Sequence, residues 1–506
     1  MIKLENIRGM RSINNSILSI IISCFIAFLT SILIYKNVLI GSATALLIVF
    51  TIMIFLVCLF IGVQKTMLFL LFVTLAFNIE LPLVSFQNGY SAQHPGGLRA
   101  ALVINQFFLI ILFWLIASIK KNQKMSTIQE INYRKSIELV LYIIFVITGI
   151  ISLLFSYSKI AAVYPVERLL FMLILILLCS KIELTLLWDI FLKAMLVLVP
   201  VQFFIGFIQY LTGEPVGLRI LGESKNPFRA DTVFGLQERG MSGTLGHPGI
   251  LGIFSTVLLP ILLVSFFNIN KKRFVMRILL LITIVLNILT IMLTNARTSM
   301  AIMAVLIILI FIGGMFIRRN RGLSNKNMIL MICCLGLIFL GVLYSMLDKL
   351  IERFSGSDFL YQFEYRNGLG DLSMSVLGES FKNFIIGVGP NNYTDVLSKM
   401  GTGFAYTQPV HNMYLLMLVE GGIFHFLSYV GLIIAIIFKM LAVIKHGAYD
   451  YAFKALGVLS ATLGMAVYNF TGWAMYNNQA FIFFTVLCIF SMKIHSESKI
   501  VVQKKI

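Results

Sequence analysis

Apolar residues occur along the chain in long runs that are separated by shorter polar segments. A helix needs about 20 predominantly apolar residues to cross a bilayer, and about fourteen runs are candidates. We expect membrane-spanning helices near residues 17–35, 42–63, 66–79, 100–119, 137–156, 166–180, 184–211, 249–268, 275–294, 300–317, 328–346, 411–438, 455–470 and 477–492. Two of these runs are short, so the pattern predicts an all-α polytopic membrane protein with about 12 to 14 transmembrane helices. Alternating segments typical of membrane β-strands are absent from the sequence.

The composition supports this class. Of 506 residues, 59% are hydrophobic and only 12% are charged, whereas soluble domains carry roughly 25% charged residues. All six cysteines lie in apolar runs without metal-ligand spacing, which predicts small buried side chains: Cys24, Cys58, Cys179, Cys333, Cys334 and Cys488.

The distribution of basic residues predicts the orientation. The N-terminal "MIKLENIRGMRSINNS" lacks the short apolar core and cleavage site of a signal peptide, so we interpret it as a cytoplasmic tail. The basic segments "KKNQKMSTIQEINYRK", "NINKKRFVMR", "RRNRGLSNKN" and "SESKIVVQKKI" then also face the cytoplasm. This is the positive-inside bias, and it accounts for the net charge of +19 without a nucleic-acid partner. We therefore expect a multi-pass protein of the cell membrane with both termini cytoplasmic.

Two long segments divide the chain on the opposite face. We distinguish N-terminal transmembrane helices (1–211), central helices (212–346) with a first outer loop (212–248), a large extracytoplasmic loop (347–410), and C-terminal transmembrane helices with a cytoplasmic tail (411–506). Outer segments longer than the ~12–15 residues usual for a structureless loop are generally functional. The active face is therefore expected to be extracytoplasmic.

Polar residues accompany the apolar run "QPVHNMYLLMLVEGGIFHFLSYV", residues 408–430. His411 and Asn412 stand at the outer start of the expected helix, and Glu420 lies about 13 Å further along it. An imidazole suits general-base work near neutral pH, although a histidine at a helix start is often only structural. A carboxylate within the membrane serves either packing or chemistry and should face the protein interior. The nine-residue offset places Glu420 on the opposite side of an ideal helix from His411.

Five arginines lie at or near the outer ends of the expected helices: Arg99, Arg168, Arg239, Arg297 and Arg366. Guanidinium groups bind phosphate through paired hydrogen bonds. The alternative for each is a contact with lipid headgroups or a local ion pair, and for Arg168 the neighbouring Glu167 is the obvious partner.

Glycines in "GVGPNNY" (387–393) provide a turn whose backbone N–H groups are suited to an anion. The turn lacks the lysine and the strand-to-helix context of a nucleotide-binding loop. The outer segments contain no HExxH, no carboxylate pair at metal spacing and no GxSxG.

Four stretches together resemble the O-antigen ligase and O-antigen polymerase superfamily of bacterial envelope glycan enzymes. They are "RGMSGTLGHPGILG", "TNARTSM", "YRNGLGDLSMSVLGESFKNFIIGVGPNNY" and "HNMYLLMLVEGGIFHFL", in the family's order, between about residues 239 and 430. The resemblance implies a glycosyltransferase that takes glycan from undecaprenyl pyrophosphate and joins it to an acceptor hydroxyl outside the cytoplasmic membrane.

The resemblance also implies roles for particular residues. His411 corresponds to the catalytic base and Arg366 to the loop arginine that engages pyrophosphate, with Arg239 and Arg297 as further pyrophosphate ligands. We expect four residues to support this site: Asn412, Glu420, Gly387 and Gly389. Arginines can stabilise the leaving pyrophosphate without a metal, so we expect an inverting-type, metal-independent reaction without a cofactor.

Polymerisation of lipid-linked repeat units into a capsule, exopolysaccharide or O-antigen is the favoured interpretation. Its partners would be the undecaprenyl-pyrophosphate-linked donor and acceptor, the lipid bilayer, and flippase and chain-length regulator proteins. Ligase-type transfer to a lipid, protein or cell-wall acceptor is an alternative with the same chemistry. A polysaccharide flippase or transporter, or a scaffold protein without activity, would belong to other classes. Transporters tend to show related halves with midplane sites, whereas the polar residues here gather near the outer face.

Overall fold

The computed structural model describes most of the chain after residue 61. The described residues are 62–85, 100–119, 133, 135–225, 229–231, 236–238, 240–270, 272–324, 329, 336, 357–400 and 409–503. The spans expected near 17–35, 42–63 and 328–346 lie almost wholly outside these residues, as do Arg99 and Arg239. Residues 1–70 and 71–506 form two compact units. Of the first, only the start of helix α3 (Val63–Val73) is described, and the fold and site below belong to the second.

Nine helices within the described ranges are long and apolar enough to cross a membrane. They are α7 (Ile137–Leu154), α8 (Lys159–Cys179), α9 (Leu184–Thr212), α10 (Pro248–Asn268), α11 (Phe274–Leu293), α12 (Arg297–Arg319), α17 (Met413–His446), α18 (Tyr449–Tyr468) and α19 (Asn478–Gln503). Each overlaps a predicted span, although several bounds differ, as at α8 and α19, and the predicted class of all-α polytopic membrane protein is confirmed.

Two of the expected spans differ from the structure. Helix α3 ends at Val73 and is followed by strand β1 (Glu80–Ser85), which pairs antiparallel with β2 (Ala100–Asn105) before helix α5 (Gln106–Ile119) begins. The first six residues of the span expected at 100–119 are therefore a strand. Its β-branched Val103 and Ile104 favour this conformation, and the Asn105 side chain accepts the N–H of Phe108 (3.0 Å), so it caps the start of α5.

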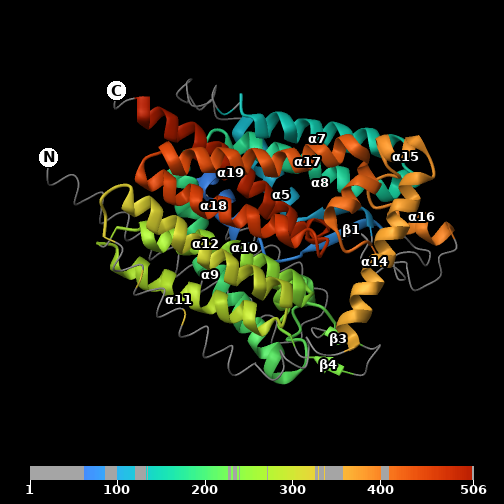
Figure 1. Ribbon diagram of the computed structural model, residues 1–506, viewed down its shortest axis with the longest axis horizontal. Coiled ribbons are helices and arrows are strands. Elements are labelled where there is room, and N and C mark those ends of the chain that lie inside the picture. The colour runs from blue at the N-terminus through green and yellow to red at the C-terminus, as the bar shows by residue number, and fades with distance from the viewer. Residues whose placement is uncertain are drawn as a thin grey trace. The chain divides into compact units, whose positions relative to one another are not determined.

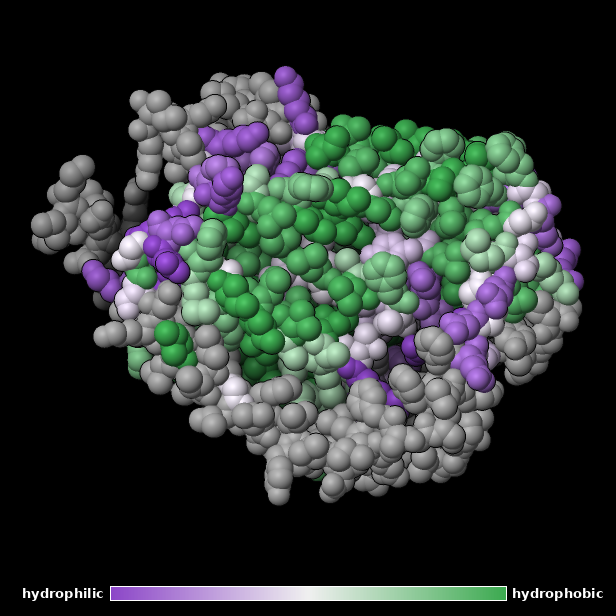
Figure 2. Space-filling model, in the orientation of Figure 1, coloured by the Kyte–Doolittle hydropathy of each residue, from purple (hydrophilic) through white to green (hydrophobic). Residues whose placement is uncertain are grey.

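Helices α10 and α19 lie in the interior of the bundle, since most residues in the apolar stretch of each helix are buried. Helix α10 packs against α11, α12 and α18, while α17 packs against α7, α18 and α19 (Figure 1). Helices α7, α12 and α17 expose large apolar side chains instead, and Figure 2 shows hydrophobic residues across this face with hydrophilic residues gathered at the ends. Such an apolar belt is what lipid requires of a helical membrane protein.

Connecting segments from distant parts of the chain meet at one end of the bundle, which we call the His411 end. It comprises the described residues of 155–158, 213–247, 294–296, 379–412 and 469–477. Backbone hydrogen bonds join these segments, from Tyr157 to the Val388 carbonyl (3.0 Å) and from Met413 to the Asn469 carbonyl (2.7 Å). Figure 1 shows the helices of residues 357–399 at this end, where α17 begins.

The opposite end, which we call the basic end, is formed by the connections after α8, α10, α12 and α17. Hydrogen bonds join these connections; for example, the Arg318 Nη1 donates to the Tyr449 hydroxyl (3.1 Å). Its described basic residues include Lys181, Lys272, Arg273, Arg318, Arg319, Arg321 and Lys445. This is the end predicted to be cytoplasmic, and its orientation across the membrane stays a prediction.

The large loop predicted at 347–410 contains helical structure where it is described. Helices α14 (Ser357–Gly378), α15 (Phe381–Ile386) and α16 (Tyr393–Lys399) precede α17. The first outer loop, predicted at 212–248, contains a two-stranded antiparallel sheet, β3 (Arg229–Asp231) with β4 (Leu236–Glu238). Helix α17 begins at Met413, two residues after the start that the sequence predicted at His411.

Candidate functional site

Helix α17 is interrupted at Gly422, about two and a half turns after it begins. Gly422 has a φ of 76° and a ψ of 178°, which ends the regular hydrogen-bond ladder. The N–H groups of Val388 and Gly389 donate to the carbonyls of Val419 (2.9 Å) and Glu420 (3.0 Å) instead. A non-helical backbone inside a membrane bundle needs such partners from the surrounding protein. The loop of residues 387–393 therefore completes the broken helix.

The predicted supporting residues Gly387 and Gly389 lie at this crossing. Both have positive φ, 83° and 107°, a region that favours glycine. A Cβ atom on Gly387 would overlap the Glu420 carbonyl, and one on Gly389 would overlap Ser156. The close approach of two backbones thus requires glycine at both positions. The N–H of Gly389 donates to the Glu420 carbonyl and not to an anion.

We expect Gly387→Ala to destabilise the protein by about 2 kcal/mol, since it combines a strained φ with an overlap against backbone. Thermal unfolding of the purified protein in detergent measures this change. Gly370→Ala is the matched control, because a Cβ at Gly370 in α14 meets nothing within 4 Å. Equal unfolding midpoints for the two variants would contradict the close crossing of the 387–393 loop and α17.

The carboxylate of Glu420 is buried, at 7% exposed, and is held by groups from two other segments. It accepts hydrogen bonds from the Tyr476 hydroxyl and from the N–H of Tyr393 (3.3 Å). Burial and the nearby Glu420 charge keep the pKa of Tyr476 well above its ordinary value, so this hydroxyl stays protonated and donates. No ion pair involves Glu420 among the described residues. Hydrogen bonds from these two tyrosines satisfy the carboxylate in the interior position that the sequence predicted for it.

Arg168 fixes the segment that carries Tyr476. Its guanidinium is buried and donates to the Tyr476 carbonyl (2.8 Å) and to the Asn478 Oδ1 (2.9 Å). It also lies over the Phe481 ring, 4.9 Å from the centroid. The sequence favoured a local pair with Glu167, whereas the described contacts join Arg168 to the α18–α19 connection.

Asn412 caps helix α17, because its Oδ1 accepts the N–H groups of Tyr414 (3.0 Å) and Leu415 (3.1 Å). This places the preceding residue, His411, in a half-buried position at the helix start. Its ring lies edge-on to Trp473, with centroids 6.3 Å apart and planes at 74°.

Trp473 in turn lies 6.3 Å from the ring of Tyr476 at 88°. The imidazole of His411 is thus separated from the Glu420 carboxylate by two aromatic side chains. The predicted opposite placement of His411 and Glu420 on the helix agrees with this arrangement.

Arg366 lies on α14, whose later turns pack against the Glu420 network. Leu369 and Ser373 follow it at helical spacings of three and seven residues, so the three share a face. The Ser373 and Tyr393 hydroxyls are 2.6 Å apart, and the Tyr393 hydroxyl also donates to the Leu369 carbonyl (3.3 Å). Burial raises the pKa of Tyr393 to about 12, against a lowering effect of Ser373, so its hydroxyl stays protonated. Arg366 is therefore one turn from Leu369 and two turns from Ser373, which both contact Tyr393, the residue that donates to Glu420.

Arg297 is the first residue of α12 and is half-buried. Its helix begins against α10, where a Cβ on Gly252 would lie 2.8 Å from the Ser299 Oγ. The start of α10 is joined to α18, because the Tyr468 hydroxyl donates to the Gly249 carbonyl (3.4 Å). The N-termini of α10, α12 and α17 are thus connected through the end of α18.

Arg239 lies outside the described residues, but its neighbours are placed. The N–H of Met241 donates to the Leu293 carbonyl (2.9 Å). A Cβ on Gly240 would lie 2.8 Å from the carbonyl of Thr294, three residues before Arg297. The chain that follows Arg239 therefore contacts the α11–α12 connection.

The structure thus brings five of the eight predicted residues into one set of contacts: His411, Asn412, Glu420, Gly387 and Gly389. Arg366 lies on α14, which packs against α15, α16 and α17, whereas Arg297 lies on α12, which packs against α10 and α18. Three aromatic residues of the site were not named from the sequence: Tyr393, Trp473 and Tyr476. Tyr393 closes the "GVGPNNY" turn that the sequence singled out, whereas nothing in the local pattern distinguishes Trp473 and Tyr476 from the many other aromatic residues of the chain. Within the described residues no group of three or more His, Cys, Asp or Glu is placed to hold a metal ion.

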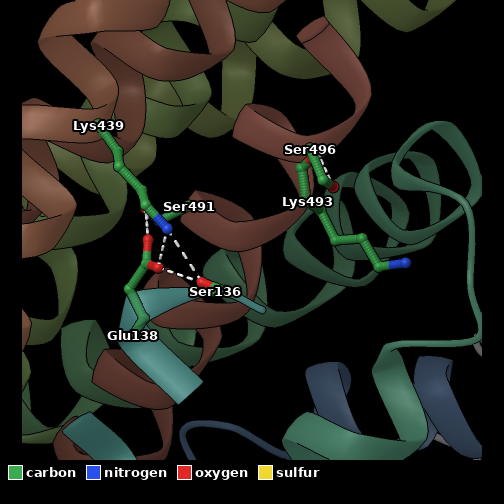
Figure 3. Close-up of polar contacts among 6 residues, drawn as sticks. All are labelled: Ser136, Glu138, Lys439, Ser491, Lys493 and Ser496. Atoms are coloured by element: carbon green, nitrogen blue, oxygen red, sulfur yellow. Dashed lines mark hydrogen bonds and ion pairs between the residues drawn. The ribbon is translucent and has the colours of Figure 1, made fainter. Parts of the chain in front are cut away.

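A second polar cluster lies toward the basic end. Figure 3 shows the side chains of Lys439, Ser136 and Ser491 directed at Glu138, while Lys493 points away. Glu138 is fully buried, forms an ion pair with Lys439, and accepts from the Ser491 hydroxyl (2.9 Å). This cluster joins α7, α17 and α19, so we interpret it as structural.

Replacing one member of this ion pair is expected to destabilise the bundle. Lys439→Met leaves the Glu138 carboxylate buried without its cation, at a cost of about 3 kcal/mol. The double variant Glu138→Gln/Lys439→Met should recover most of this loss, and exposed Lys445→Met is the control. Chemical unfolding in mixed micelles measures the free energy of unfolding of the single variant, the double variant and the control. A single variant as stable as the control would show that the pair contributes nothing.

Comparison of the chain with protein-family models and with curated proteins found no match in either case.

Proposed function

We propose that the protein is a membrane glycosyltransferase that polymerises undecaprenyl-pyrophosphate-linked oligosaccharide repeat units into a surface polysaccharide. The proposal places the reaction on the outer face of the cytoplasmic membrane. The observation that carries it is the position of His411. Its imidazole stands at a capped helix start, beside Trp473, in a region that buried hydrogen bonds hold in place. A general base needs such a fixed geometry.

In the proposed reaction His411 accepts the proton of an acceptor hydroxyl. The hydroxyl oxygen forms a bond to the anomeric carbon of the donor glycan while the bond from that carbon to the pyrophosphate oxygen breaks. The pyrophosphate lipid leaves with the electron pair, so a single displacement inverts the anomeric configuration. The proton is later released from the imidazole to solvent.

The leaving pyrophosphate gains negative charge, which cations can stabilise. Arg366, Arg239 and Arg297 supply guanidinium groups for this purpose. Arg297 also begins helix α12, whose N-terminus carries a partial positive charge. Arg168 is excluded from this set, because its guanidinium is buried against the α18–α19 connection.

Glu420 acts as support in this proposal. Its carboxylate already accepts from Tyr476 and Tyr393, and two rings separate it from His411. Its hydrogen bonds hold Tyr476 and therefore Trp473, which contacts the imidazole. The acidic residue thus fixes the position of the base.

The test is a reaction of the purified protein in lipid nanodiscs with lipid-linked repeat units extracted from the source organism. Polymerisation gives a ladder of products that differ by one repeat unit. Transfer to a different acceptor without a ladder would make the protein a ligase instead. Movement of lipid-linked units across vesicles without any glycosidic bond formed would assign it to the transporter class and overturn the proposal.

A further inference from the structure

A cavity of about 440 Å³ lies beside the 387–393 loop, which contributes Val388 to its lining. It is formed by the α7–α8 connection, the α14–α15 connection, α15, the 387–393 loop and α16. The residues that bear on its chemistry are Phe155, Tyr157, Glu379, Lys382, Asn383 and Lys399. Its volume falls within the range of about 300–1,000 Å³ that is usual for small-molecule sites. We call it the Lys382–Lys399 pocket.

The pocket carries two ammonium groups. The Nζ of Lys382 donates to the Phe155 carbonyl (2.9 Å), and the Nζ of Lys399 lies 4.3 Å from the centroid of the Tyr157 ring. Neither lysine forms an ion pair with any described residue. Each ammonium has three N–H donors, so donors remain for a ligand on both.

One carboxylate also lines the pocket, that of Glu379. Its Oε2 accepts from the Asn383 Nδ2 (3.5 Å), which occupies part of its hydrogen-bonding capacity. Two lysines against one glutamate leave the pocket with a net positive charge. An anionic group is therefore the ligand chemistry that the electrostatics favour.

Aromatic side chains give the pocket a second property. Tyr157 is 50% exposed and Phe155 is 51% exposed, so both present ring surface to a ligand. Sugar rings pack their C–H faces on aromatic rings, and hydroxyl groups find partners in amides such as Asn383. Aromatic faces, an amide and cations together suit a saccharide that bears an acidic group.

We propose that the Lys382–Lys399 pocket binds an anionic saccharide unit, with its carboxylate or phosphate between the two lysines and a sugar ring on Tyr157. Val388 lines the pocket and donates to the broken helix α17, so the ligand would lie against the loop that holds the Glu420 region. Identifying this saccharide as part of the acceptor glycan rests on the proposed function. The binding itself does not, because it requires no turnover.

The test is calorimetric titration of the purified full-length protein with a glucuronic-acid-containing disaccharide and with its neutral glucose counterpart. Binding of the acidic disaccharide should weaken roughly tenfold in Lys382→Gln and in Lys399→Gln, each of which removes a charged hydrogen-bond donor. Exposed Lys181→Gln at the basic end is the matched control and should bind like the wild type. His411→Ala should also bind normally, which separates this proposal from that of the catalytic base.

Phosphate on a lipid headgroup shares the anionic chemistry, so a second arm distinguishes the two sources. Nanodiscs with phosphatidylglycerol are compared with nanodiscs of phosphatidylcholine alone, using the same variants and unfolding midpoints as a check of folding. The proposal is overturned if the wild type binds the neutral disaccharide as tightly as the acidic one. It is also overturned if both lysine variants bind the acidic disaccharide with wild-type affinity. Lysine-dependent binding of phosphatidylglycerol without binding of the disaccharide assigns the pocket to lipid and overturns it as well.

Discussion

His411→Ala is expected to abolish chain extension while the protein still inserts and folds normally. The variant removes the group that accepts the acceptor proton, and losing such a group costs on the order of 10²-fold or more in rate. The helix start itself should survive, because Asn412 and not His411 supplies the cap. The measurement is the rate of repeat-unit addition in nanodiscs, together with the unfolding midpoint.

His446→Ala is the matched control, since His446 is an exposed histidine in the last turn of the same helix. It should retain the wild-type rate. Full-length polymer from His411→Ala would remove the base from the mechanism, whatever the effect on stability.

Arg366→Ala is expected to lower kcat/KM on the order of 10²-fold, through the loss of a charged partner for the leaving pyrophosphate. Arg366→Lys should recover only part of this loss, since an ammonium does not reproduce the paired hydrogen bonds of a guanidinium. The effect should be the same across the pH range, because arginine stays charged.

The control for this position is Arg319→Ala, an exposed arginine at the basic end of α12. It removes the same charge from a helix end without touching the candidate site. If Arg366→Ala and Arg319→Ala give equal kinetics, Arg366 has no part in binding the pyrophosphate. A kinetic loss confined to KM would instead indicate binding that is uniform in the ground state and the transition state.

Much of the fold was predictable because lipid imposes a simple rule on the sequence. A run of about 20 apolar residues satisfies its own backbone only as a helix, and the nine described membrane-length helices follow such runs. The rule fails at 100–105, where apolar residues pair with β1 inside the protein. The hydropathy of Val103 and Ile104 indicates that they are buried away from water. It does not indicate whether protein or lipid surrounds them.

The site was less predictable, because its decisive contacts join segments that are distant in the chain. Tyr476 lies 56 residues from Glu420, and no local pattern pairs a tyrosine in a short connection with a carboxylate in a helix. Gly421 and Gly422 stand next to each other within the apolar run. That Gly422 breaks the helix follows only from the 387–393 loop, which provides donors for the freed carbonyls.

The buried guanidinium of Arg168 has a consequence for biogenesis. Arg168 lies in the middle of α8, where inserting an arginine alone costs about 3 kcal/mol. Its partner Asn478 is synthesised 310 residues later, so this contact cannot assist α8 when the ribosome first delivers it to the translocon. The insertion free energy of the apolar residues of α8 must therefore offset the cost of inserting this arginine. The final docking of the α18–α19 connection onto Arg168 takes place only after nearly the whole polypeptide has been translated.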